Sequence, residues 1–225
     1  MDDNYLKRIC AKEAIKYIRD GMVVGLGGGR TIAYLIEYIK EENIKVKIVT
    51  PSTKTKMICI ENGLEVLHTG FVDRVNVAFD GCDQVDEKLN ALKSGGGIHT
   101  KEKLIASMSE EYILLVDEAK VEKELSFKAP VVLEILEDSL KYVERKVLQL
   151  GGKPIVRASD IKDGFIISDN GNLLMNVSFS DVGNVNELNS RLINICGVVE
   201  TSLFTSVITK AIVAGEQGIR VINRQ

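Results

Sequence analysis

Two acidic side chains follow an apolar run in the stretch DGCDQ, residues 80–84. The preceding run RVNVAF alternates apolar and polar residues and predicts a strand, so Asp80 and Asp83 are expected beyond its carboxyl end. Neighbouring carboxylates repel each other and separate their pKa values, which suits acid–base chemistry. A plain turn is the alternative, because Asp and Gly are common turn formers. Cys82 is a conceivable nucleophile, but a small buried side chain is the favoured interpretation.

A glycine loop, GLGGGRT, spans residues 25–31 between an apolar run and an amphipathic pattern. Such a loop exposes backbone N–H groups, and the start of a helix attracts anions, so the loop predicts phosphate binding. A tight structural turn is the alternative. The dinucleotide pattern fails because Arg30 replaces its third glycine and the next strand ends in VTPST rather than in an acid. The P-loop pattern also fails, whereas the hydroxyls and lysine of TPSTKT suit a phosphomonoester.

A third loop, KSGGGIHTKEK, spans residues 93–103. Lys93 precedes three glycines, and Thr100 is a candidate cap for a helix that carries Glu102 in its first turn. An acid there is a candidate base, although it often only complements the helix dipole. A capping box does not explain Glu102, because position 103 is Lys. His99 is a second candidate base, but a single loop histidine is more often an ordinary loop residue.

The elements that must position these loops alternate between strands and helices up to about residue 127. This alternation predicts parallel β-α-β units in a layered α/β domain. The predicted strands are 22–26, 45–50, 64–68, 75–80 and 112–117, and the predicted helices are 11–21, 31–40, 54–63 and 100–109. Ligands bind beyond the carboxyl ends of strands in open α/β sheets, so the three loops are expected to converge there.

The pattern changes near Pro130 to a strand, helix, two strands, helix and strand, the split β-α-β layout. In this part, DNGN at 169–172 predicts a hairpin turn between FIIS and LLMNVSF, and GVVETSLF at 197–204 predicts one strand. The last segment, 210–223, is expected to return to the first domain. We therefore predict a Rossmann-like α/β domain, residues 1–127 plus 204–225, and a smaller α+β ferredoxin-like domain, residues 128–203.

Composition excludes several classes of protein. The chain has 225 residues, a net charge of −3 and no long basic run, which argues against nucleic-acid binding. No apolar stretch approaches the ~20 residues of a transmembrane helix, and the N-terminus MDDNYLKRIC does not resemble a signal peptide. The four cysteines are widely spaced, which indicates reduced thiols in a cytoplasmic protein. With two histidines, a histidine-based metal site is not expected.

Taken together and in order, the three loops resemble those of the ribose-5-phosphate isomerase type A family. The family pattern is G-x-G-[TS]-G-S-T, then D-G-A-D-E, then K-G-G-G-x-x-x-x-x-E-K. Four later segments are also similar: VDEAK at 116–120, LGGKP at 150–154, SDNGN at 168–172 and GVVETSLF. The resemblance covers essentially the whole chain. It implies interconversion of D-ribose 5-phosphate and D-ribulose 5-phosphate without metal or organic cofactor, by a homodimer or homotetramer.

The resemblance also implies residue roles. Glu102 would move the proton between C2 and C1, Asp80 and Asp83 would handle ring opening and the sugar hydroxyls, and Lys93 would stabilise the enediolate. The residues expected to bind the substrate or its phosphate are Lys7, Gly27, Gly28, Gly29, Arg30, Thr31, Gly95, Gly96, Gly97 and Lys120.

Five positions depart from the family pattern: Gly28, Arg30, Gln84, Ser94 and Asn176. The candidate base and both aspartates are retained, which favours an active isomerase. An isomerase of a related sugar phosphate and a non-catalytic sugar-phosphate-binding paralogue are the alternatives, because fold does not fix function.

Overall fold

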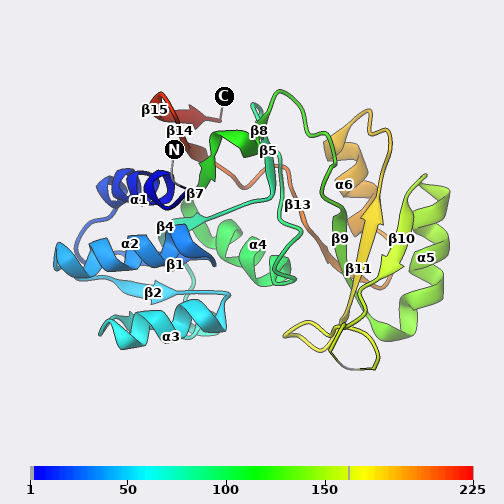
Figure 1. Ribbon diagram of the computed structural model, residues 1–225. Helices are drawn as coiled ribbons and strands as arrows, with labels where there is room; N and C mark the ends of the chain where they lie inside the picture. The colour runs from blue at the N-terminus through cyan, green and yellow to red at the C-terminus, as the bar shows by residue number, and fades with distance from the viewer. Residues whose placement is uncertain (1–2, 162, 225) are drawn as a thin grey trace.

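The chain folds around three β-sheets (Figure 1), and the computed structural model describes residues 3–161 and 163–224. The strands of the largest sheet are β1 (Val23–Leu26), β2 (Lys47–Val49), β3 (Glu65–Val66), β4 (Val75–Asp80), β7 (Ser109–Asp117), β14 (Lys210–Gly215) and β15 (Gly218–Asn223). Their spatial order is β15-β14-β7-β4-β1-β2-β3, and all neighbours pair in parallel except β14 and β15. The segment 210–223 therefore does return to the first sheet.

Helices cover both faces of this sheet. They are α1 (Asp3–Ala14), α2 (Arg30–Glu41), α3 (Thr53–Glu61) and α4 (His99–Met108), with short 3-10 turns η1 (Ile15–Tyr17), η2 (Thr69–Phe71) and η3 (Glu118–Lys120). Alternate strand residues face opposite sides. Val77 and Phe79 pack with α1 and α2, whereas Ala78 packs with Ile105 of α4. Figure 1 shows α4 between the large sheet and the smaller part of the molecule.

Helix α2 illustrates how the sequence pattern produces this packing. Ile32, Leu35, Ile36 and Ile39 recur at helical spacing and are all buried against the sheet, as predicted. The helix begins after Gly29, whose φ of 102° is a conformation that residues with a side chain rarely adopt. The first turn of α2 is thereby presented at the end of β1.

The smaller part contains β9 (Val131–Ile135), β10 (Lys153–Val156), β11 (Leu173–Ser178) and β12 (Val198–Thr201), with α5 (Leu140–Gln149), α6 (Val185–Ile193) and the turn η4 (Glu137–Ser139). The sheet order is β10-β11-β9-β12 and all pairs are antiparallel. This order and the β-α-β-β-α-β sequence of elements confirm the predicted ferredoxin-like layout. Val143 and Val147 of α5 are buried in its core, as predicted.

One predicted hairpin forms only at its turn, where the Ser168 N–H donates to the Asn172 carbonyl at 2.8 Å. The strand paired with β11 is β10, and FIIS at 165–168 forms only isolated bridges, Ala158 with Phe165 and Ile167 with Leu173. The side chains of Phe165, Ile166 and Ile167 are exposed, so this apolar run does not pack into the core. An apolar run beside a good turn signal was therefore insufficient to identify the strand.

A third, four-stranded sheet joins the two parts and was not predicted. It contains β5 (Gln84–Asp86), β6 (Ala91–Leu92), β8 (Val121–Glu122) and β13 (Leu203–Phe204) in the order β13-β6-β5-β8. The single strand predicted for GVVETSLF is consequently wrong, because this segment divides into β12 and β13, which belong to different sheets. Strands of two or three residues are too short to produce a clear periodic pattern.

The predicted fold class, a Rossmann-like α/β part with a smaller ferredoxin-like part, is confirmed by these topologies. The boundaries at 1–127 plus 204–225 and at 128–203 stay a prediction. Among residues 3–161 and 163–224, no helix has the length and apolar character needed to cross a membrane.

Candidate active site

A pocket of about 520 Å³ opens beyond the carboxyl ends of β1, β2 and β4. From β1 the chain proceeds to β2 and β3, whereas β4 and β7 lie on the other side of β1, so the pocket is at a reversal of strand order. Such a reversal is a usual ligand site in open α/β sheets. The pocket is lined by Gly28, Gly29, Ser52, Thr53, Asp80, Gly81, Cys82, Asp83, Lys93, Gly95, Gly96, Ile98, Glu102, Lys120 and Asp169.

Lys93 lies between two acids at the floor of this pocket. Its Nζ is 3.0 Å from Asp80 Oδ2 and 3.3 Å from Glu102 Oε1, and it also donates to the carbonyl oxygen of Gly81. The side chains of Lys93, Asp80 and Glu102 are each less than a tenth exposed. The three loops singled out in the sequence therefore place one cation and two acids in direct contact.

Burial and mutual charge determine the protonation of this group. Burial, together with the nearby charge of Asp80, raises the pKa of Glu102 to about 8, while Lys93 opposes that shift. Burial alone would lower the pKa of Lys93, but Asp80 and Glu102 outweigh it and raise that pKa. At neutral pH Lys93 therefore stays charged, while Glu102 retains a proton.

The first turn of α4 positions Glu102. Its backbone N–H donates to the Ile98 carbonyl at 3.0 Å, and the side chain lines the pocket. The neighbouring His99 is buried, and burial lowers its pKa to about 4. His99 is not among the residues described along the pocket wall, so Glu102 is the better candidate base of the two.

Asp80 is fixed by contacts from three directions at the end of β4. Tyr112 of β7 donates its hydroxyl to Asp80 Oδ2 at 3.0 Å, and the Gly81 N–H donates to Oδ1 at 2.8 Å. Burial raises the pKa of Tyr112 well above its usual value, so this phenol stays protonated. A side chain at Gly27 would overlap the Asp80 carboxylate, which requires glycine there. Tyr112 was not predicted from the sequence, because its contact with Asp80 joins residues on two different strands.

Asp83 is exposed and faces the loop that follows Lys93. Its Oδ2 accepts from the backbone N–H groups of Ser94 at 2.6 Å and Gly95 at 2.9 Å. Across this loop, Arg157 donates to the carbonyls of Ser94 and Gly95. Asp83 thus orders the loop that holds Lys93 and also presents an oxygen to the pocket.

The opposite wall of the pocket can receive an anion. Gly28 and Gly29 precede α2, and Ser52 and Thr53 begin α3, where Ser52 caps the helix by accepting from the Thr55 N–H at 3.2 Å. Two helix starts with neutral hydroxyls and backbone donors suit a phosphate group. Lys120 also lines the pocket and donates to the Cys82 carbonyl at 3.0 Å.

The predicted site residues divide into two sets. Nine line the pocket: Asp80, Asp83, Lys93, Glu102, Gly28, Gly29, Gly95, Gly96 and Lys120. Five are not among the described residues that line it: Lys7, Gly27, Arg30, Thr31 and Gly97. Asp169 lines the pocket but was not predicted as a site residue, although the SDNGN segment that contains it was noted.

The chain has relatives among known proteins. The family model for ribose 5-phosphate isomerase A (phosphoriboisomerase A) matches residues 47–218. The ribose-5-phosphate isomerase A of Methanocaldococcus jannaschii is 37% identical over the full length of both chains.

The chain belongs to the ribose-5-phosphate isomerase A family.

Solved structures of isomerases of this family share the fold. A structure of the M. jannaschii isomerase has a TM-score of 0.92 at 35% identity, covering 99% of this chain and all of the other. A D-ribose-5-phosphate isomerase in complex with phospho-erythronic acid has a TM-score of 0.93 at 33% identity, with full coverage of both chains.

Arg30, a departure from the isomerase family pattern, is exposed at the start of α2. Its Nη1 donates to Asn4 Oδ1 of α1 at 3.2 Å. Lys7, also on α1, lies 3.9 Å from Asp117 at the end of β7. Of these two predicted phosphate ligands, Lys7 therefore lies on α1 and Arg30 beside it, and neither is among the described residues that line the pocket.

The other departures from the isomerase pattern lie around the loop 93–97 and the third sheet. Gln84 turns away from the aspartates and donates to Glu122 Oε1 at 3.1 Å and to Ser126 Oγ at 2.8 Å. The Ser94 hydroxyl donates to the Pro130 carbonyl, and Asn176 accepts from Arg157 Nε at 2.6 Å. None of these three side chains is among the described partners of Lys93, which contacts Asp80 and Glu102.

Proposed function

We propose that this chain is an aldose–ketose isomerase that interconverts D-ribose 5-phosphate and D-ribulose 5-phosphate through an enediolate, the reaction of the non-oxidative pentose phosphate pathway. The observation that carries the proposal is the contact of Lys93 with both Asp80 and Glu102 in a pocket with two helix starts, in a chain of this family. An enediolate mechanism needs a positioned base and a group that stabilises the developing oxyanion, and a buried cation can be that second group.

In the proposed reaction, the Glu102 carboxylate removes the proton from C2 of the open-chain aldose. The C1 carbonyl oxygen then gains negative charge, and the Lys93 ammonium stabilises it. Glu102 returns the proton to C1 while the proton of the C2 hydroxyl is transferred to the C1 oxygen, so that C2 becomes the carbonyl carbon of the ketose and C1 carries the hydroxyl. Atoms and charge balance within one substrate and the side chains, so turnover is expected to persist in the presence of a metal chelator.

Asp80 and Asp83 are proposed to act on the hydroxyls and on opening of the furanose ring. Asp80 is supported by its rigid place beside Lys93, and Asp83 by its exposed carboxylate at the pocket wall. The phosphate is proposed to bind where Gly28, Gly29 and Ser52 meet, since helix starts attract anions.

The test is an aldose–ketose conversion assay on a panel of pentose and hexose phosphates. Conversion of D-ribose 5-phosphate with the highest kcat/KM supports the proposal. Preference for another sugar phosphate would identify an isomerase of a related substrate. Binding of ribose 5-phosphate by calorimetry without conversion would instead identify a binding paralogue.

Assembly and compartment are also proposals. A homodimer or homotetramer in the cytoplasm agrees with the family resemblance and with the widely spaced cysteines. Static light scattering of the purified protein measures the assembly directly, and a mass of one chain of 24.8 kDa would contradict it.

A further inference from the structure

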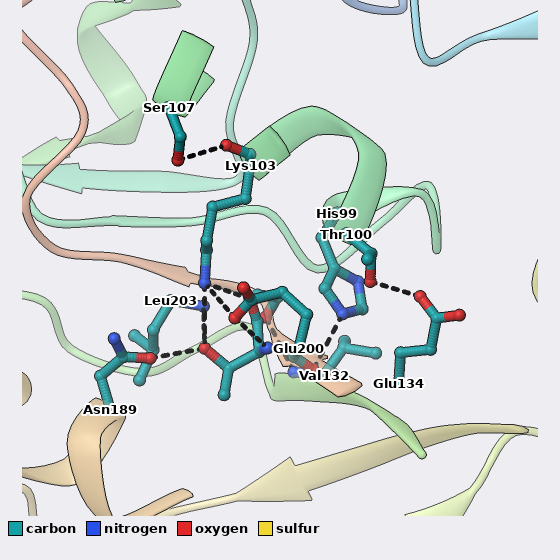
Figure 2. A network of polar contacts seen from close by, with 11 residues as sticks. His99, Thr100, Lys103, Ser107, Val132, Glu134, Asn189, Glu200 and Leu203 are labelled. Atoms are coloured by element: carbon teal, nitrogen blue, oxygen red, sulfur yellow. Dashed lines mark hydrogen bonds and ion pairs between the residues drawn. The ribbon is translucent and has the colours of Figure 1, made fainter. Parts of the chain in front are cut away.

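A buried carboxylate, Glu134 of β9, lies behind the active site and takes no direct part in the proposed reaction. It is fully buried, and four neutral side chains donate to it. The distances to Glu134 Oε1 are 2.7 Å from Ser168 Oγ, 2.8 Å from Asn172 Nδ2 and 3.0 Å from Asn170 Nδ2. The fourth donor is the Thr100 hydroxyl, which reaches Oε2 (Figure 2).

These hydrogen bonds determine the charge of Glu134. Burial alone would raise its pKa, but the donors Thr100, Asn172, Ser168 and Asn170 outweigh burial and lower the pKa of this carboxyl. The buried charge is therefore held by oriented neutral dipoles. Loss of a donor or of the carboxylate would leave buried polar groups without partners, which is costly in an interior.

One arm of this network leads to the base. Thr100 lies in the first turn of α4, two residues before Glu102. Glu200 of β12 is the cross-strand partner of Glu134. It contacts α4 as well, because its carboxylate accepts a hydrogen bond from Lys103 Nζ at 2.7 Å. Thr100 and Lys103 are three residues apart, so they lie on one face of α4. Figure 2 shows both contacts on the small sheet, with His99 between them.

The other arm leads to the pocket wall. Ser168, Asn170 and Asn172 belong to the turn that carries Asp169, which lines the pocket. Lys101 of α4 lies 3.4 Å from Asp169, so the turn also contacts the helix. A single carboxylate consequently joins the small sheet to two separate walls of the active site.

We propose that Glu134 is a positioning residue for the isomerase reaction: through Thr100 it fixes the first turn of α4 and hence Glu102, and through the 168–172 turn it fixes Asp169. This inference rests on the proposed function. A misplacement of about 1 Å can reduce a rate by as much as ~100-fold, so hydrogen bonds that set the position of Glu102 can affect turnover without touching the substrate.

The first test separates the hydroxyl of Thr100 from its shape. Thr100→Val removes the donor and keeps the volume, so kcat should fall about 10-fold or more with KM little changed. Thr100→Ser keeps the hydroxyl and should restore most of kcat. Ser107→Ala is the matched control, because Ser107 is on the same helix and its hydroxyl donates to the Lys103 carbonyl away from the pocket. Its kcat should equal that of the wild type.

The second test separates the two arms. Asn172→Ala removes one hydrogen bond between Glu134 and the 168–172 turn. It should raise KM more than it lowers kcat, because this turn contributes to the pocket wall and does not contain the base. Glu134→Gln keeps one acceptor oxygen, and the Thr100 hydroxyl can rotate to accept from the new amide. This variant should therefore be less impaired than Glu134→Ala, and it covers the case in which Glu134→Ala fails to fold.

The results that would overturn the positioning role differ from those that would overturn the proposed function. If the wild type shows no turnover, both the proposed function and the positioning role are overturned. Turnover by the wild type, with equal kcat in Thr100→Val and Thr100→Ser, overturns only the positioning role. A lower melting temperature in Thr100→Val with unchanged kcat, KM and pH profile also overturns the positioning role alone, because Glu134 would then serve stability and not turnover.

Discussion

Glu102 is a buried acid that shares one lysine with a second acid, and this environment suits a base that must both take and return a proton. Glu102→Gln keeps the shape of the side chain and removes its basicity. We expect kcat to fall by ~10²–10⁴-fold or more with substrate affinity little changed. Steady-state kinetics with calorimetric binding of ribose 5-phosphate measures both quantities. Turnover near that of the wild type would exclude Glu102 as the base.

The raised pKa of Glu102 has a predictable effect on the pH profile. The base must be deprotonated, so activity should be lost as pH falls below the pKa, which is about 8. We expect kcat/KM to increase with pH and to level off above a midpoint near 8, since kcat/KM reports the free enzyme. Rates between pH 6 and 9.5 measure this midpoint. A plateau that already begins near pH 5 would show that Glu102 titrates as an ordinary carboxylate.

Arg30 has to exchange one interaction for another if it is to bind phosphate. A hydrogen bond between a guanidinium and a phosphate contributes about 1.5–3 kcal/mol. The contact of Arg30 with Asn4 is exposed to solvent and has a neutral acceptor, so we assign it about 0.5–1.5 kcal/mol. The difference of about 1 kcal/mol predicts that Arg30→Ser raises KM by roughly 5-fold with kcat little changed. Inhibition by inorganic phosphate should weaken in parallel.

Arg8 provides a matched control for Arg30. It is also an exposed arginine at the contact of α1 and α2, where it pairs with Glu37 at 3.3 Å. Arg8→Ser should leave KM and phosphate inhibition unchanged. Equal KM values and equal phosphate inhibition in Arg30→Ser and the wild type would make Arg30 a surface substitution.

At the scale of elements, the ends of β1 and β4 approach so closely that only glycine fits between them. A Cβ at Gly27 would overlap the Asp80 carboxylate, which Tyr112 and Lys93 already hold. Gly27→Ala should therefore displace Asp80, reduce kcat/KM by ~10-fold or more and destabilise the fold by about 1–3 kcal/mol, as overpacking does.

Thermal unfolding and kinetics of Gly27→Ala measure these effects. Gly28→Ala is the stability control, because the nearest atom to its added Cβ would be Ser52 Oγ at an ordinary 3.9 Å. The control should keep the melting temperature of the wild type. A Gly27→Ala protein with wild-type melting temperature and kcat/KM would show that Asp80 can move without consequence.

Elements with strong local signals were predictable from the sequence. The parallel strands, α2 and the three loops followed from periodicity and glycine placement, and so did the convergence of Asp80, Lys93 and Glu102, because strand ends share one edge of a sheet. Tyr112 and Glu134 were not predictable, since their roles depend on partners 32 to 38 residues away. The exposed run FIIS had the composition of a strand, and only its lack of a packing partner distinguishes it from one.

At the scale of the whole molecule, His99, the first residue of α4, is buried where this helix meets the small sheet, and it links the packing of the two to pH. Burial lowers its pKa to about 4, and its Nδ1 has no hydrogen-bond partner among residues 3–161 and 163–224. An unfolded chain binds the proton near pH 6.5, so the contribution of His99 to stability is complete above pH 6.5 and is lost as pH falls towards 4. The loss amounts to roughly 3 kcal/mol.

Urea unfolding at several pH values tests this link. The free energy of unfolding of the wild type should fall more steeply between pH 6.5 and 4 than that of His99→Asn, whatever the starting stability of the variant. The exposed His68 supplies the control, and His68→Asn should keep the wild-type slope. Identical slopes in all three proteins would show that His99 does not contribute to acid sensitivity.

The return of the chain to its first sheet has a consequence for synthesis on the ribosome. Strand β14 pairs with β7, about a hundred residues earlier in the chain, and the smaller part lies between them. Until residues 210–215 have emerged, one edge of β7 has no neighbour, and unpaired edges promote association between chains. The strands of the smaller sheet, residues 131–201, emerge during that interval. We therefore expect the nascent chain to be most vulnerable to aggregation just before its last strands are made, after most of its active-site residues have already been synthesised.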